Sequence, residues 1–323
     1  MRNKKERNSE TAKMKTSRYL VSLLFLLFPL SQSSALAADS LKLQEVTDDV
    51  YAIVGDLGNR AAENLGNNAT FGFIVTSAGV VLIDSGGTYK GAREIHRLIK
   101  GVTDQPITTV INTGGQDHRW LGNGYFKEQG AKIVASRKAV EDQKARAQDQ
   151  FIMLGNLVGD EGVKGTIAVY AEQMFDDKLS FELGGVIFEI SHSGQAHTPG
   201  DSFVWLPQKS VMFTGDIVYT QRMPGVGSQS NSKSWIEVYK SMAAYKPEHI
   251  VPGHGQVTDL ATANADTYDY LVFLRKSVSS FMEDGGDIVD IGSVDQSNFH
   301  YLLNHETLAG RNAQQVFIEL EWE

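Results

Sequence analysis

Residues 111–123 read INTGGQDHRWLGN, and this stretch decides the fold and the chemistry that the chain can have. The apolar, β-branched run at residues 108–113 predicts a buried strand. The run is followed by two glycines, a glutamine and then Asp117 and His118. A carboxylate oxygen and an imidazole nitrogen both suit zinc. Taken alone, however, a solvated Asp-His pair in a loop is the simpler interpretation.

Four other stretches also place a metal-type side chain in a turn that follows a predicted strand. They are VLIDSG at 81–86, QAHTPGD at 195–201, FTGD at 213–216 and IVPGHG at 250–255. Each half of the chain thus contains strands, a helix, and a strand that ends in a candidate ligand loop. This repetition predicts a site at one sheet edge, on short loops held by rigid strands.

The order of these motifs (DSG, NT…DH, HTPGD, TGD, GHG) resembles that of the metallo-beta-lactamase fold superfamily over roughly residues 45–260. The resemblance implies an α/β (α+β) fold, the four-layer αβ/βα sandwich of the metallo-beta-lactamase type. One departure is serious. The superfamily usually has His-x-His-x-Asp-His at the central motif, whereas residues 113–116 here are Thr-Gly-Gly-Gln.

In the resembling family, two metals share a bridging aspartate. The resemblance therefore implies one complete metal position, formed by Asp117, His118, Asp216 and His254. The other position keeps only His197 and a share of Asp216, because both histidines of His-x-His are missing. Two carboxylates and two imidazoles can hold one divalent ion and leave room for a water. We expect one zinc ion, with iron or manganese as alternatives.

The leading hypothesis is a metallo-hydrolase whose metal-bound water attacks an ester, lactone, thioester or amide of a small molecule. Asp117 or His197 would orient that water or take its proton. The alternative is a catalytically silent binding or accessory protein on the same scaffold, because the first metal position is broken. A true beta-lactamase and a sulfur dioxygenase are both disfavoured, since each uses that first position.

Three further residues are candidates for substrate contact. Arg119 and Trp120 directly follow the Asp-His pair and would suit an anionic or planar substrate, although a packed loop anchor is the competing interpretation. Asn68 lies in a loop rich in Gly and Asn at residues 57–69, which in relatives often leans over the site. A plain connection between strands explains this loop equally well. Residues 150–175 are predicted to form a mobile cover over the site, or else an ordinary excursion.

Composition excludes several function classes. The chain contains no cysteine, which rules out a disulfide, a thiolate nucleophile and a Cys-ligated metal. Without residues 1–37 the chain has 30 − 7 = 23 basic and 39 − 2 = 37 acidic residues. An acidic chain without a basic cluster argues against nucleic acid or an anionic membrane surface as a partner.

The chain is predicted to divide into a signal peptide at residues 1–37 and a metallo-beta-lactamase-like domain at residues 38–323. Basic residues precede the short apolar run YLVSLLFLLFPL, and Ala35-Leu36-Ala37 provides a cleavage signal. The run is too short to span a bilayer. We therefore expect a periplasmic or secreted protein that has no membrane contact after cleavage. Residues 298–323 predict a C-terminal extension, mainly helical, with a helix-loop-strand order.

Overall fold

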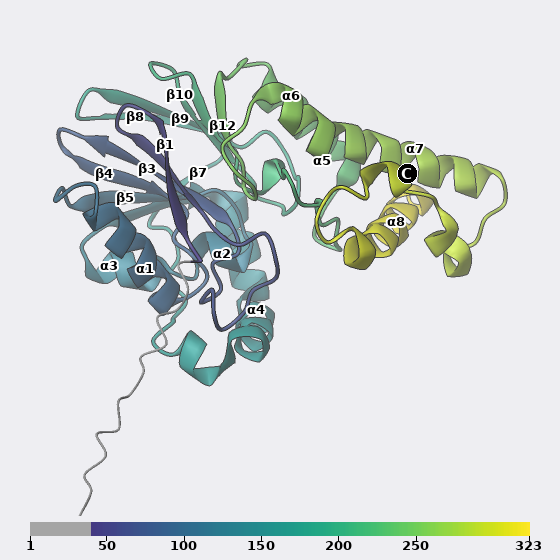
Figure 1. Ribbon diagram of the computed structural model, residues 1–323, viewed down its shortest axis with the longest axis horizontal. Helices are drawn as coiled ribbons and strands as arrows, with labels where there is room; N and C mark the ends of the chain where they lie inside the picture. Colours follow the sequence, from purple (N-terminus) through teal and green to yellow (C-terminus); the bar gives the residue numbers. More distant parts are fainter. Residues whose placement is uncertain (1–39) are drawn as a thin grey trace, which may run out of the picture. The chain divides into compact units, whose positions relative to one another are not determined.

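The computed structural model describes residues 40–323, so the predicted signal peptide lies outside the described residues. Two sheets and two groups of helices make up this part of the chain (Figure 1). The first half comprises β1 Lys42–Thr47, β2 Val50–Val54, β3 Thr70–Thr76, β4 Gly79–Ile83, α1 Tyr89–Lys100, β5 Ile107–Asn112, α2 Asp117–Trp120, α3 Asn123–Glu128, β6 Lys132–Ser136, α4 Arg137–Val163 and β7 Gln173–Phe175.

The second half forms the other sheet and its helices. It comprises β8 Lys178–Leu183, β9 Val186–Ser191, β10 Phe203–Leu206, β11 Val211–Phe213, the 3-10 turn Gly215–Ile217, α5 Ser232–Ala243, β12 His249–Val251, α6 Leu260–Ala263, α7 Asp269–Glu283, two 3-10 turns at Ile288–Ser293 and Ser297–Phe299, and α8 His305–Glu321. A π-helical turn, Asn264–Tyr268, joins α6 to α7.

The two sheets each combine antiparallel and parallel pairing. The first sheet has the order β1-β2-β3-β4-β5-β6-β7, antiparallel up to β4 and parallel from β4 to β7. The second has the order β12-β11-β10-β9-β8, and only β11 and β12 are parallel. Since β4 and β5 run parallel, and β11 and β12 also do, the loops that follow these strands leave each sheet from one edge.

Alternating side chains divide the interior into three apolar layers. In β4, Val80 and Leu82 face α1 and α3, whereas Val81 and Ile83 face the second sheet. Strand β10 divides in the same way, with Val204 facing the first sheet. Burial on both faces explains why β3 and β4 are apolar almost throughout. Helices α1, α3 and α4 cover one outer face, and α5 and α7 cover the other, which confirms the four-layer sandwich; α8 packs against α7, farther from the sheets (Figure 1).

A single glycine allows the two sheets to approach closely. Gly72, in the middle of β3, faces the ring of Phe213 in β11, and a Cβ atom at this position would lie 2.1 Å from that ring. Phe213 is 2 % exposed and belongs to the apolar layer between the sheets. Any larger residue at position 72 would push the sheets apart.

Two sequence-based expectations differ from the structure. Residues 150–158 are not an independent cover, because they continue α4 up to a kink at Gly159 (φ 74°, ψ 167°). Leu154 and Val158 pack into a small apolar cluster with Trp120. The C-terminal extension ends in helix α8 and has no strand between residues 298 and 323. In the part that the structure describes, no helix is long and apolar enough to cross a membrane.

Replacing Gly72 with alanine should destabilise the fold, because the added methyl overlaps the ring of Phe213, which is packed between the two sheets and has no space to move away. Overpacking of this kind costs about 1–3 kcal/mol, measurable as a lower midpoint in urea unfolding. Gly310→Ala in α8 is the matched control, since a Cβ there meets nothing within 4 Å. Equal midpoints for the two variants would contradict the tight inter-sheet contact.

Candidate functional site

Loops that follow four parallel strands converge at one edge of the two sheets. Asp84 follows β4, His118 lies in α2 just after β5, Asp216 lies in the turn after β11, and His254 follows β12. A backbone hydrogen bond from Thr70 to the Gly253 carbonyl, 2.8 Å long, joins the two sheets at this edge. The side chains are therefore carried by strand ends that packing has already positioned.

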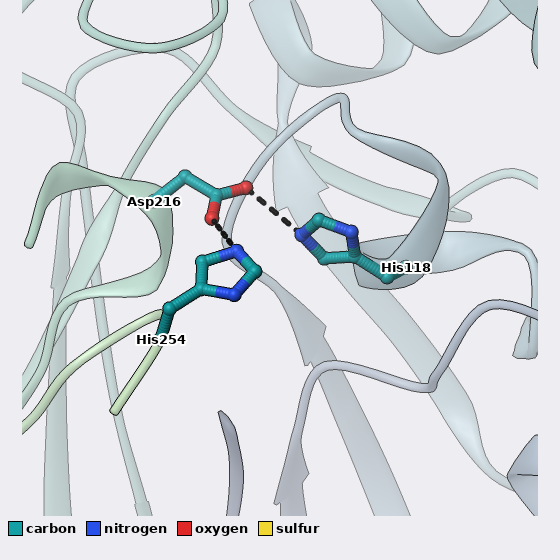
Figure 2. Close-up of side chains that lie close together, drawn as sticks. All are labelled: His118, Asp216 and His254. Atoms are coloured by element: carbon teal, nitrogen blue, oxygen red, sulfur yellow. Dashed lines mark hydrogen bonds and ion pairs between the residues drawn. The ribbon is translucent and has the colours of Figure 1, made fainter. Parts of the chain in front are cut away.

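Three predicted ligands meet in a buried cluster (Figure 2). The Nε2 atoms of His118 and His254 each lie 3.2 Å from an oxygen of Asp216, one on Oδ2 and the other on Oδ1. All three residues are at most 2 % exposed. In the described part of the chain, Asp117 and His197 are not members of this group. The site thus offers two imidazole nitrogens and one carboxylate around a common point.

A buried guanidinium holds the carboxylate of this cluster in place. The Nε and Nη2 atoms of Arg119 donate to the two oxygens of Asp216, at 3.1 and 2.7 Å. Its Nη1 donates to Asp84 at 2.9 Å and to the Thr70 carbonyl at 3.1 Å, and Nη2 also donates to the Gly253 carbonyl at 2.9 Å. All five N–H groups of Arg119 are paired. Arg119 therefore anchors the loops around the cluster, as the competing interpretation of the sequence proposed, and has no N–H group left for a substrate.

Burial and charge act in opposite directions on Asp216. Burial disfavours its ionised form, but the charge of Arg119, with a hydrogen bond from His118, holds the pKa of the carboxyl well below its usual range. Asp84 is fixed in turn by two 2.7 Å hydrogen bonds, from the backbone amide and the hydroxyl of Thr113. Asp216 thus remains ionised and can serve as a metal ligand at any ordinary pH.

The tautomer of His254 favours a cation at the cluster. Its Nδ1 lies 2.8 Å from the Asn68 carbonyl, which can only accept, and 3.2 Å from Nη1 of Arg222, which can only donate. The shorter contact assigns the proton to Nδ1. Burial, then the charge of Arg222, lowers the pKa of His254 well below its usual value, so the ring is neutral. With this tautomer the lone pair of Nε2 faces Oδ1 of Asp216 at 3.2 Å, and a cation between these two acceptors would stabilise them.

His118 has the opposite arrangement because Arg60 lies against it. A guanidinium can only donate, and Nη2 of Arg60 is 2.9 Å from Nδ1 of His118. Nε2 of His118 therefore carries the proton and donates to Asp216. Arg60 also forms an ion pair with Asp117, whose Oδ2 is buried without a partner. Burial opposes ionisation of Asp117, but Arg60 outweighs it and lowers the pKa of the carboxyl.

The remaining candidates have other neighbours. His197 donates from Nδ1 to the Gly225 carbonyl at 2.8 Å, and burial lowers its pKa to about 4. Trp120 is fully buried and donates to Gln150 at 2.9 Å, which favours the loop-anchor interpretation. Asn68 is 1 % exposed, and its backbone carbonyl, rather than its side chain, contacts His254.

Helix α4 fills the region beside the two glycines that replace His-x-His. Gln143 and Gln150 donate to the carbonyls of Gly114 and Gly115, at 3.0 and 2.8 Å. A Cβ atom at Gly115 would lie 1.8 Å from a carboxylate oxygen of Asp142. The structure therefore compensates for the lost histidines with polar contacts and leaves no space for their return.

Sequence reasoning missed the two arginines that flank the cluster, Arg60 and Arg222. Nη1 of Arg222 lies 3.2 Å from Nδ1 of His254 and donates to the Gly58 carbonyl at 3.1 Å. Both arginines are isolated in loop sequence, where no strand or motif marks them. The one available signal was that Arg60 lies in the loop at residues 57–69 already considered for the site.

Comparison with known proteins agrees with this geometry. A family model described as the metallo-beta-lactamase superfamily matches residues 66–254, more than half of the chain. The chain belongs to the metallo-beta-lactamase superfamily. A metallo-beta-lactamase type 2 of Bacteroides fragilis is 24 % identical over 250 residues, 75 % of this chain and 90 % of that protein. The corresponding protein of Elizabethkingia meningoseptica is 24 % identical over 239 residues, 72 % and 85 % of the two chains.

Solved structures show the same superfamily fold. A metallo-beta-lactamase from Pontibacter korlensis superposes with a TM-score of 0.57 at 22 % identity, covering 72 % of this chain and 99 % of its own. A stereoselective inverting sec-alkylsulfatase from Pseudomonas sp. gives a TM-score of 0.65 at 18 % identity, covering 86 % of this chain and 50 % of its own. This superfamily member therefore has a metallo-hydrolase fold and a possible metal site at His118, Asp216 and His254.

Removing the buried guanidinium should unfold much of this site. Arg119→Met leaves two buried carboxylates without their cation, and breaking a buried ion pair in this way costs about 3–5 kcal/mol. Urea unfolding at neutral pH measures the loss. Arg137→Met is the matched control, because its ion pair with Asp176 lies on the surface and should contribute little. If both variants retained wild-type stability, Arg119 would not be the anchor described above.

Proposed function

We propose that this protein is an exported, metal-dependent hydrolase of small carbonyl compounds such as esters, lactones, thioesters or amides. His118, Asp216 and His254 would hold one zinc ion, the ion that suits two imidazoles and a carboxylate. Iron or manganese would suit the same donors. The observation that carries the proposal is the pair of acceptors, His254 Nε2 and Asp216 Oδ1, that face each other at 3.2 Å.

The residues around the cluster have separate parts in this proposal. A divalent metal held there would lower the pKa of a water and polarise a carbonyl oxygen. Asp117 has a free buried oxygen, Oδ2, that can orient the attacking water or accept its proton. Burial lowers the pKa of His197 to about 4, so its Nε2 is unprotonated at neutral pH and can orient the water as a hydrogen-bond acceptor. Arg60 and Arg222 supply positive charge at the same place.

Export is the part of the proposal that rests on sequence alone. The basic residues, the apolar run and Ala35-Leu36-Ala37 support secretion or a periplasmic location. With net acidic charge in the remainder of the chain, a small molecule is the favoured partner, rather than a nucleic acid or a membrane.

Metal analysis tests the proposed centre. Purified protein should hold about one zinc ion per chain, and His254→Gln should weaken binding by a factor of about 100 or more, because a direct ligand is lost. His249→Gln is the matched control, since His249 begins β12 and lies outside the cluster. Equal zinc content in His254→Gln and wild type would end the proposal.

Activity on a substrate panel then separates turnover from silent binding. The panel contains esters, lactones, thioesters and amides, with alkyl sulfates added because the sulfatase structure covers 86 % of this chain. Hydrolysis that falls with zinc content in His254→Gln supports the enzyme. Zinc-loaded protein that is stabilised by a ligand but hydrolyses none of these compounds would instead indicate a binding or accessory protein.

Arg60 should compete with the metal. His118 can offer the Nε2 lone pair only if its proton moves to Nδ1, which now faces the Arg60 guanidinium. Arg60→Met removes this donor and frees Asp117, so zinc affinity should rise about tenfold or more, equivalent to about 1.4 kcal/mol. Calorimetric titration of zinc-free protein measures this affinity, with Arg137→Met as the control. Weaker zinc binding in Arg60→Met would show that Arg60 supports the centre.

A further inference from the structure

A separate group of metal-type side chains lies in the C-terminal extension, around the start of α8. His300, His305 and Glu306 each offer a ligand atom, and these atoms all lie within 4.8 Å of one another. The centroids of the two imidazole rings are 4.1 Å apart, and the ring planes are nearly perpendicular, at 88°. His300 and Glu306 are exposed, so a dissolved ion can reach the group directly. We name these three residues the C-terminal cluster.

The tautomer of His305 leaves one ring nitrogen without a partner. Its Nε2 lies 3.1 Å from the Gln296 carbonyl, which can only accept, so Nε2 carries the proton. Nδ1 is therefore a lone-pair acceptor, and it is buried without a hydrogen bond. Buried acceptors are nearly always satisfied. A histidine whose far nitrogen donates to a backbone carbonyl is also the usual arrangement of a metal ligand.

The segment that carries the cluster is fixed before any ion binds. Phe299 and Leu302 are buried in the core beneath α7 and α8. The amide of Leu303 donates to the Gln221 carbonyl at 3.0 Å, and the Leu303 carbonyl accepts from the Met223 amide at 3.0 Å. Ligands on a backbone held at both ends lose little conformational freedom when an ion binds.

We propose that the C-terminal cluster binds a divalent transition-metal ion such as zinc, nickel or cobalt. Two imidazole nitrogens and one carboxylate suit these ions, whereas calcium and magnesium prefer oxygen alone. The positive end of the α8 dipole opposes a cation, but Glu306 in the first turn offsets this charge. Water would complete the coordination on the exposed side.

An ion in this cluster would brace the segment beside the candidate active site. Leu303 pairs with the backbone at residues 221–223, and that backbone carries Arg222, the neighbour of His254. The proposal does not depend on the active-site metal, because the two groups share no ligand.

The test counts bound metal in zinc-free protein that is titrated with cobalt, using equilibrium dialysis and the visible absorption of the bound ion. The double variant His300→Ala/Glu306→Ala removes two exposed ligands and should not disturb the core. His249→Gln is the control. We expect the double variant to bind about one ion fewer than the wild type, or to bind it more than about tenfold more weakly. Magnesium at the same concentration should not compete.

Hydrogen exchange supplies a second measurement that is independent of stoichiometry. Zinc should slow exchange at residues 297–306 in His254→Gln, where the active-site ligand is lost, but not in the double variant. Equal binding by the wild type and the double variant would overturn the proposal, even if His254→Gln had lost its own ion. If only His254→Gln lost binding, all the metal would belong to the active site, and this result would also overturn the proposal.

Discussion

The structure depends on one buried cation, the guanidinium of Arg119. It pairs with Asp84 at the end of β4 and with Asp216 at the end of β11, and it reaches carbonyls of β3 and of the loop after β12. These partners belong to both sheets, so one side chain joins the two halves of the sandwich at the edge where the site lies. Two buried carboxylates close together would repel each other without it, and neither could remain ionised at low cost.

The same ion pair limits the chemistry of the site. Asp216 accepts from Arg119 through both oxygens, so part of its charge is already neutralised before any metal binds. Arg60 neutralises Asp117 in the same way. The cluster therefore favours a cation through the lone pair of His254 Nε2 more than through net negative charge.

Loss of the histidine pair is accommodated by the fold rather than left as a gap. Helix α4 places glutamine side chains on the carbonyls of Gly114 and Gly115, and Asp142 occupies the space that a side chain at position 115 would need. The change is thus distributed over a loop and a helix about 30 residues apart. Such compensation explains why the four-layer architecture persists although half of the resembling family's metal motif is absent.

The sequence by itself determined the strands and the order of the motifs, because apolar alternation and turn residues are local signals. The four-layer fold followed from the resemblance of that motif order to the metallo-beta-lactamase fold superfamily. The same resemblance predicted that His118, Asp216 and His254 belong to one site, because their motifs match the ligand motifs of the superfamily. Only the tertiary structure decided that Arg119 is an anchor, that Asp117 pairs with Arg60, and which ring nitrogens of His118 and His254 carry protons. These properties depend on contacts between residues far apart in the chain, and no local pattern records such contacts.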